Sequence, residues 1–377
     1  MRHARVGGTE RFLDAVAIHL AEQGHEVVIV CRRHVESPHP DVRFEVLHDF
    51  ALGSSWRAWG FAKAVERHVR DAGYDLVFAL GKTWSHDLLR SGGGCHQTYI
   101  ERAHRYVKTP MERALGMGAL KNKVALAIEE RAMAPDAARR IIAISEMVKR
   151  DIVARHGFPA ERVEVIHNGV DTERFRPGLR DGVGKELRGS LGWNDEHTVA
   201  LFLGQGYGRK GLSRLLRSIA PLAESRPDLR VAVVGREHGQ AGWEREAAEL
   251  GLGDRIAFLG ERGDPEACFA AGDVYVLPTH YDAFAFSVLE ALATGLPVIT
   301  TDQAGASELL GPAEGQVVAA DGGDDELTAA LETWLDKDRL AAAAAPARAL
   351  AERYTFTRTL EQTTRVLGEV AAEVARG

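Results

Sequence analysis

Two carboxylates, Asp282 and Glu290, lie eight residues apart near the end of an α/β pattern. An apolar run, Val274–Leu277, predicts a strand, and the pattern from Ser287 to about Thr294 predicts a short helix that ends at Gly295. Vicinal hydroxyls could hydrogen-bond to an acid one turn into such a helix. The alternative is that the acid only complements the helix dipole.

The start of the same helix is a candidate anion site. The first amides of a helix have no acceptor within the helix, and they point toward whatever lies beyond the sheet edge. We therefore expect the amides near Ala285, Phe286 and Ser287 to contact an anionic group.

A glycine-rich loop lies between a predicted strand, Val199–Leu203, and a predicted helix, Leu212–Glu224. Gly206–Gly211 matches G-x-G-x-x-G, which on its own suggests a dinucleotide oxidoreductase with Glu237 as the ribose acid. However, the motif contains two adjacent cations, which a pyrophosphate held by backbone amides would not need. The side chains favoured for a diphosphate are the guanidinium of Arg209 and the ammonium of Lys210.

Composition limits the classes of protein to which the chain can belong. Its 377 residues predict two domains, and the net charge of −7 gives no general attraction to nucleic acid. Cys31, Cys95 and Cys268 form no C-x-x-C pair, which argues against a disulfide framework or a structural zinc and is typical of a reducing cytosol. No apolar run reaches 18 residues and the N-terminus lacks a signal peptide, so we expect a cytoplasmic protein without a membrane span.

Strands and helices alternate along the sequence, which predicts two doubly wound, Rossmann-like domains with parallel sheets that face a cleft. We place the domains at 1–175 and 176–359, with a C-terminal helix at about 360–377 that packs back on the first. The strand expected before Gly7 and Gly8 is missing, because only six polar and basic residues precede them. We interpret the chain as starting downstream of the true start.

Two further features lie in the first domain. His96 follows three glycines in a loop, where a core or capping role and a ligand contact are both open. The segment from Arg102 to Lys123 carries six basic residues and one acid, a local charge of +5. It is either a solvated helical face or a contact surface for anionic lipid. The charged residues are Arg102, Arg105, Lys108, Glu112, Arg113, Lys121 and Lys123.

These segments together resemble a known family. VIHNGVD, GRKG, FLG and YDAFAFSVLEALATGLPVITT occur in the order and spacing of a GT-B fold glycosyltransferase of family four. GQGYGRKG, the YDAF start and GGGCHQTYIE resemble, more narrowly, the lipopolysaccharide core glucosyltransferase I group. The segments are Val165–Asp171, Gly208–Gly211, Phe258–Gly260, Tyr281–Thr301, Gly204–Gly211 and Gly92–Glu101.

The resemblance implies an activity. It implies a retaining, metal-independent hexosyltransferase without a cofactor, which moves glucose from a UDP-linked donor to a lipopolysaccharide core or similar glycolipid. The first domain would bind the lipid-linked acceptor and the second the nucleotide sugar. The enzyme would lie peripherally on the inner face of the cytoplasmic membrane.

The resemblance also implies roles for individual residues. Glu290 would bind the ribose hydroxyls, Asp282 the donor sugar, and His96 would be an active-site residue. Gly7 and Gly8 match the loop that approaches the diphosphate, and Gly204 the glycine after the strand. Two departures concern the donor site: most relatives have Glu in place of Asp282, and many have Gly-Phe-Gly where this chain has Ala283–Ala285. Gln205 occupies the family's usual Arg position, so Arg209 beside Lys210 would supply that charge.

The chemistry follows from the residue types. Breaking the anomeric C–O bond builds negative charge on the diphosphate, which Arg209, Lys210 and the helix N-terminus would stabilise in place of a metal. No D-x-D motif occurs in a suitable loop. No carboxylate nucleophile is evident, so we expect the acceptor to attack on the same face. The alternatives are a nucleotide-sugar epimerase, a dinucleotide-dependent oxidoreductase or a catalytically silent binding protein.

Overall fold

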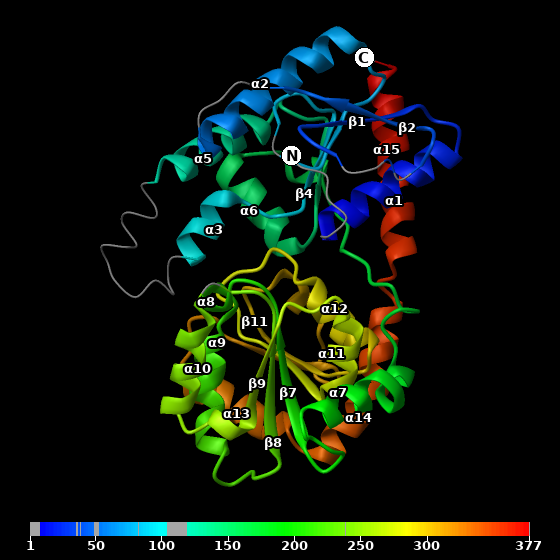
Figure 1. Ribbon diagram of the computed structural model, residues 1–377. Helices are drawn as coiled ribbons and strands as arrows, with labels where there is room; N and C mark the ends of the chain where they lie inside the picture. The colour runs from blue at the N-terminus through cyan, green and yellow to red at the C-terminus, as the bar shows by residue number, and fades with distance from the viewer. Residues whose placement is uncertain are drawn as a thin grey trace. The chain divides into compact units, whose positions relative to one another are not determined.

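A computed structural model describes residues 8–376 except 35, 36, 38, 49–52, 82, 104–118 and 238. The chain forms two compact units (Figure 1). The first contains the described residues up to His167 and those from Thr357 onward, and the second contains Asn168–Phe356. Residues 168–175, which the sequence pattern placed in the first domain, thus belong to the second unit. The prediction that the strand before Gly7 is missing concerns residues outside the described ranges.

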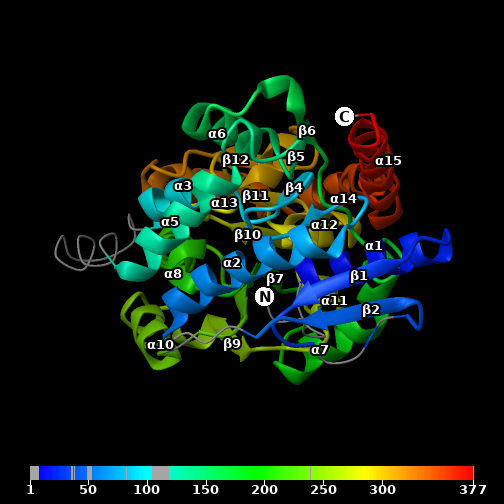
Figure 2. The same ribbon diagram turned by 90° about the horizontal axis from the view of Figure 1, so that it is seen from above.

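The first unit is built on parallel strands. β1 (Val27–Cys31) and β2 (Val42–Val46) pair with each other and run side by side in Figure 2. A second sheet has the order β3-β4-β5-β6, and all of its described pairs are parallel. Its strands are β3 (Phe78–Ala79), β4 (Leu88–Ser91), β5 (Arg140–Ala143) and β6 (Val163–Val165). The helices are α1 (Gly8–Glu22), α2 (Ser54–Ala72), α3 (His96–Ala103), α5 (Leu120–Ala132), α6 (Glu146–His156) and α15 (Phe356–Val374).

Helix α15 is anchored to this unit although it is the last helix of the chain. Arg140 of β5 forms ion pairs with Glu369 and Glu373, and Arg365 pairs with Glu164 of β6. The Thr359 hydroxyl donates to the carbonyl of His167 at 2.9 Å. These contacts attach the C-terminal helix to the strands of the first unit.

The second unit contains a six-stranded parallel sheet with the order β9-β8-β7-β10-β11-β12. In chain order this is 3-2-1-4-5-6, the strand order of a Rossmann fold. The strands are β7 (Thr198–Leu203), β8 (Leu229–Val234), β9 (Ile256–Gly260), β10 (Val274–Leu277), β11 (Val298–Thr301) and β12 (Gly315–Val318). β10 is fully buried on both faces, as expected for a central parallel strand.

Helices cover both faces of this sheet. Figure 1 shows α9, α10 and α13 on one face and α7, α11, α12 and α14 on the other. The bounds are α7 (Lys185–Ser190), α8 (Tyr207–Lys210), α9 (Leu212–Ile219), α10 (Gln240–Glu249), α11 (Pro265–Ala271), α12 (Phe286–Ala293), α13 (Asp324–Trp334) and α14 (Lys337–Glu352). None of the helices in the described ranges is both long and apolar enough to cross a bilayer.

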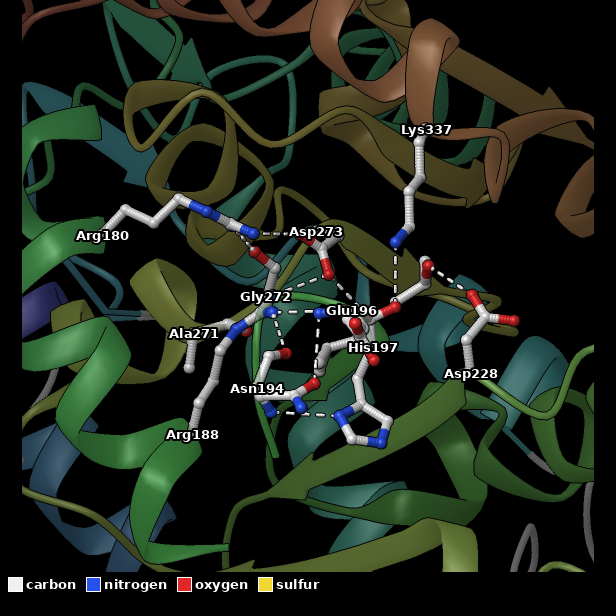
Figure 3. Close-up of polar contacts among 12 residues, drawn as sticks. Arg180, Arg188, Asn194, Glu196, His197, Asp228, Ala271, Gly272, Asp273 and Lys337 are labelled. Atoms are coloured by element: carbon white, nitrogen blue, oxygen red, sulfur yellow. Dashed lines mark hydrogen bonds and ion pairs between the residues drawn. The ribbon is translucent and has the colours of Figure 1, made fainter. Parts of the chain in front are cut away.

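A polar cluster fixes the start of β10 (Figure 3). Asp273 accepts hydrogen bonds from Arg188 Nη2 at 2.6 Å and from the amide of Val199 at 2.7 Å, and it also pairs with Arg180. The Arg188 side chain is 3% exposed and that of Asp273 is 13% exposed. Asp273 directly precedes β10, Val199 belongs to β7, and Arg188 belongs to α7. This one carboxylate therefore joins the two central strands to α7 and, through Arg180, to the turn before α7.

A second carboxylate near these strands leads to a prediction about pH. Arg226 and the hydroxyl of Thr198 hold the pKa of the Asp228 carboxyl well below its ordinary value. A depressed pKa in the folded state means that the carboxylate stabilises the fold above the unfolded pKa near 4. This contribution is lost as the pH falls further.

We expect Asp228→Asn to lower the free energy of unfolding at neutral pH. Below about pH 4 the unfolded chain takes up a proton at this carboxyl while the folded protein does not, so the difference between the two proteins should shrink as the pH falls from about 5 toward 2. Urea unfolding across this range measures it. A difference that stays constant over the range would contradict the assignment.

Candidate functional site

The strand order of the second unit locates its binding edge. In a sheet of this order the connections leave β7 and β10 in opposite directions, and ligands bind at the carboxyl ends of these two strands. The segments that follow them are residues 204–211 and 278–286. Of the residues that the sequence analysis assigned to the donor site in this half, these segments contain all except Ser287 and Glu290, which follow in the next helix.

The two cations of the first segment face the acid of the second. Lys210 Nζ forms an ion pair with Asp282 Oδ2, and Arg209 Nη1 lies 3.4 Å from the same oxygen. Arg209 Nη1 also donates to the carbonyl of Tyr281 at 2.8 Å. The Lys210 side chain is only 9% exposed, so this charge is held almost entirely by the protein.

The loop backbone also fixes Asp282. Its amide donates to the carbonyl of Gln303, and its carboxylate accepts from the amide of Phe284 at 3.1 Å. Burial raises the pKa of the Asp282 carboxyl, but Lys210 and Arg209 outweigh burial and hold its pKa below the ordinary value. Asp282 is therefore a carboxylate at neutral pH, and the three charges form one coupled group.

Glycines allow this arrangement. A Cβ at Gly211, where φ is +82°, would lie 2.0 Å from the carbonyl oxygen of Pro278, so the two segments touch through their backbones. A Cβ at Gly204 would lie 3.4 Å from Cε of Lys210, so the lysine side chain packs along that glycine. The G-x-G-x-x-G sequence thus forms the helical turn α8, bounded by left-handed glycines.

The helix after Asp282 begins one residue before its predicted start. Ala285 precedes α12, and Phe286 and Ser287 form its first turn. Ser287 is buried and its Oγ lies 2.7 Å from the hydroxyl of Tyr275, so its side chain is part of the core. Glu290 is half-buried on the second turn. The structure therefore brings the start of α12 directly after the Asp282 loop, as the spacing predicts.

Glu237, the ribose acid of the oxidoreductase interpretation, has a structural role. Its Oε2 accepts a hydrogen bond of 2.7 Å from the amide of Tyr207, which is the first residue of α8. The Tyr207 ring is fully buried, and this burial together with Glu237 raises the pKa of Tyr207 to about 12. The carboxylate thus caps α8.

His96 lies in the first unit and is held by residues that the sequence analysis missed. It begins α3, and its amide donates to both carboxylate oxygens of Glu129 at 2.9 Å and 2.6 Å. Its Nε2 lies 3.2 Å from Oδ1 of Asn122, which fixes the ring orientation. Glu129 is fully buried in α5. An acid inside an amphipathic helix was the only available signal, and it does not identify a partner 33 residues away.

Other expectations for the first unit lie partly outside the described residues. Gly7 is outside them, and Gly8 is the first residue of α1. Most of the basic segment is also outside, because the described chain stops at residue 103 and resumes at residue 119.

Family models match both halves of the chain. Residues 6–174 match the model described as "Glycosyltransferase Family 4", and residues 184–349 match the one described as "Glycosyl transferases group 1". The division between the two models agrees with the two-unit structure.

Individual proteins show the same likeness. The D-inositol 3-phosphate glycosyltransferase of Mycobacterium marinum is 28% identical over 96% of this chain and 80% of its own length. The lipopolysaccharide core biosynthesis mannosyltransferase LpsB of Rhizobium meliloti is 33% identical over 56% of this chain and 61% of its own length.

Solved structures share the fold over the full chain. WaaG, a glycosyltransferase involved in lipopolysaccharide biosynthesis, superposes with a TM-score of 0.81 at 22% identity and covers 97% of both chains. Anabaena Alr3699/HepE, solved with UDP-glucose, gives a TM-score of 0.69 at 20% identity over 98% of both. With both halves matched and the whole fold shared, the chain belongs to the GT-B fold glycosyltransferases of family four.

Proposed function

We propose that the protein is a retaining, metal-independent hexosyltransferase that moves glucose from UDP-glucose to a lipopolysaccharide core or similar glycolipid. The observation that carries this proposal is the group formed by Lys210, Arg209 and Asp282 at the switch point of the second unit, directly before α12. The nucleotide-sugar part is also supported by HepE, a protein of the same fold that was solved with UDP-glucose.

In this proposal the side chains of Lys210 and Arg209 bind the diphosphate of the donor. The leaving diphosphate gains negative charge as the anomeric bond breaks, and preorganised cations stabilise that charge most in the transition state. Without donor, Asp282 holds Lys210 in place. With donor bound, the phosphate oxygens share the ammonium and the first amides of α12, while Asp282 contacts a hydroxyl of the sugar. A divalent cation is not needed, because two fixed positive side chains neutralise the same charge.

The attack takes place on the face from which the diphosphate leaves. An acceptor hydroxyl that approaches this face can give its proton to the departing phosphate oxygen, and the new bond then keeps the anomeric configuration. His96, whose ring is oriented by Asn122, contacts the reacting sugar or the acceptor in this proposal.

Glu290 binds the ribose, and this role predicts a specific loss. A carboxylate that accepts from the 2′ and 3′ hydroxyls contributes about 1.5–3 kcal/mol per charged hydrogen bond. Wild type should therefore bind UDP at least about tenfold more tightly than 2′-deoxy-UDP, whereas Glu290→Gln should bind the two nearly equally. Titration calorimetry with both nucleotides measures this. If wild type and Glu290→Gln prefer UDP over 2′-deoxy-UDP by the same factor, Glu290 does not bind the ribose.

The acceptor is a membrane glycolipid in this proposal. The names of LpsB and WaaG support a lipopolysaccharide acceptor, and the local charge of +5 in the basic segment from Arg102 to Lys123 supports contact with anionic lipid. Each basic residue near such a surface contributes roughly 1 kcal/mol.

Binding to vesicles tests the lipid contact. We expect the protein to co-sediment with vesicles that contain phosphatidylglycerol, and to be released by salt. Replacing four of the six basic residues by serine should abolish the binding, and neutral phosphatidylcholine vesicles provide the control. Binding that persists in high salt or in the serine variant would contradict an electrostatic contact.

Product stereochemistry tests the reaction itself. UDP-glucose is incubated with the enzyme and chelator, and proton NMR follows the anomeric signal of the transferred or released glucose. The proposal predicts that the α-anomer forms first. First formation of the β-anomer would exclude retention, and a requirement for added Mg²⁺ or Mn²⁺ would exclude the role given to Lys210 and Arg209.

A further inference from the structure

Three metal-binding side chains meet in the first unit, and only one of them has a part in the site described above. Cys95, Glu129 and His156 each offer one ligand atom, and these atoms all lie within 4.8 Å of one another. Cys95 directly precedes α3, Glu129 lies in α5, and His156 is the last residue of α6. The fold therefore brings together three groups that are far apart in the sequence.

The group is removed from solvent. Cys95 and Glu129 are fully buried, and the His156 side chain is 10% exposed. Nε2 of His156 is buried and has no hydrogen-bond partner among the described residues, and it lies 3.5 Å from Oε1 of Glu129. A buried imidazole nitrogen is costly unless a partner satisfies it.

The spacing of two of these groups suits a shared ion. Bond lengths of about 2.0–2.3 Å to a tetrahedral zinc separate neighbouring ligand atoms by roughly 3.3–3.7 Å. The distance between Nε2 of His156 and Oε1 of Glu129 falls in this range. The amide of His96 also fixes the Glu129 carboxylate, and ligating carboxylates in metal sites are usually held by such hydrogen bonds.

A divalent ion at this point would be compatible with the charges of its ligands. Binding would deprotonate the thiol, and the ion would neutralise both the thiolate and the buried carboxylate. The alternative is a buried ion pair between a protonated His156 and Glu129.

We propose that Cys95, Glu129 and His156 supply three of the ligands of a structural zinc ion. Thiolate and imidazole ligands select zinc over magnesium or calcium. The ion would join three helices and fix the start of α3, where His96 lies. The scattered cysteines argued against zinc because cysteine pairs are the usual signal, but here one cysteine is completed by a histidine and a glutamate. This site is distinct from the transfer reaction, which we propose to be metal-independent.

Cobalt and zinc test the site in the full-length protein. The chain is stripped with chelator and titrated with Co²⁺, whose bond to a thiolate gives a near-ultraviolet charge-transfer band, or with Zn²⁺. We expect one ion per chain, the cobalt–thiolate band, and a rise in the thermal midpoint with zinc. Cys95→Ser should lose the band, and His156→Gln should lose the rise with zinc. Cys268→Ser, at a buried thiol of the second unit, should keep both.

Several outcomes would overturn the proposal. One is a wild-type protein that takes up neither ion. Another is a cobalt–thiolate band that persists in Cys95→Ser or disappears in Cys268→Ser. If Cys95→Ser does not fold, His156→Gln decides, because it keeps a polar side chain of similar length. An unchanged response to zinc in that variant would exclude His156 as a ligand. A buried ion pair alone predicts that His156→Gln lowers the thermal midpoint while zinc leaves the wild-type midpoint unchanged.

Discussion

Replacing Lys210 by alanine is expected to reduce donor turnover by about 10²–10³-fold, the usual effect of removing one preorganised group that stabilises developing negative charge. Lys210 is suited to this role because its side chain is 9% exposed and is held by Asp282. A fixed charge in a partly dry site needs little reorganisation when the diphosphate leaves. Release of UDP from UDP-glucose measures the loss. Lys337→Ala, an exposed lysine in α14 of the same unit, should keep wild-type turnover.

The alanine variant also leaves the Asp282 carboxylate buried without its main partner, which could lower activity through the fold alone. A double variant, Lys210→Met with Asp282→Asn, removes both charges and separates the two effects. We expect it to recover much of the thermal stability lost in Lys210→Ala, because the buried carboxylate is gone and Arg209 still donates to the carbonyl of Tyr281. Its turnover should stay low. Recovery of turnover together with stability would show that Lys210 serves only to neutralise Asp282.

Replacing Asp273 by alanine is expected to lower the free energy of unfolding by about 3–5 kcal/mol, the cost of breaking a buried ion pair by removing one partner. Arg188 would remain buried with only backbone carbonyls as acceptors, including that of Ala271 at 2.8 Å. The amide of Val199 would also lose its acceptor. Urea unfolding, followed by the fluorescence of Trp193 and the other tryptophans, measures the change.

The matched control is an exposed pair in the same unit. Asp195 lies 3.3 Å from Lys185, and the two side chains are 72% and 64% exposed. Exposed pairs contribute about 0.2–1 kcal/mol, so Asp195→Ala should change stability little. Similar losses in Asp273→Ala and Asp195→Ala would contradict the view that the cluster in Figure 3 holds β7, β10 and α7 together.

Much of the second unit could be predicted from sequence, because local patterns determine it. Short, largely apolar runs form the core of β7, β8, β10 and β11, and Gly295 ends α12 with a φ of +85°. The predicted helix Leu212–Glu224 was too long. Regular α-helix ends at Ile219, and a short 3₁₀ turn follows around Pro221, which cannot donate a helix hydrogen bond.

The candidate site was predictable only where its residues lie close together in the sequence. Arg209, Lys210, Asp282 and Glu290 lie in the two segments that follow the central strands β7 and β10, and the strand order of a Rossmann fold brings those segments together. The ion pair between Lys210 and Asp282 was not predicted, because the sequence suggested separate partners for each. Contacts in the first unit, such as that of Glu129 with His96, connect distant helices through buried polar groups. No local periodicity encodes such contacts.

Thermal stabilisation by nucleotides, measured without added metal, tests the central claim most directly. UDP, GDP, UDP-glucose and NADH are each added to wild type, to Lys210→Ala and to Lys337→Ala. The account predicts that UDP and UDP-glucose raise the midpoint of wild type and Lys337→Ala, that the rise disappears in Lys210→Ala, and that NADH has no effect. A rise with NADH alone, or a rise with UDP that persists in Lys210→Ala, would contradict a diphosphate site at the switch point of the second unit.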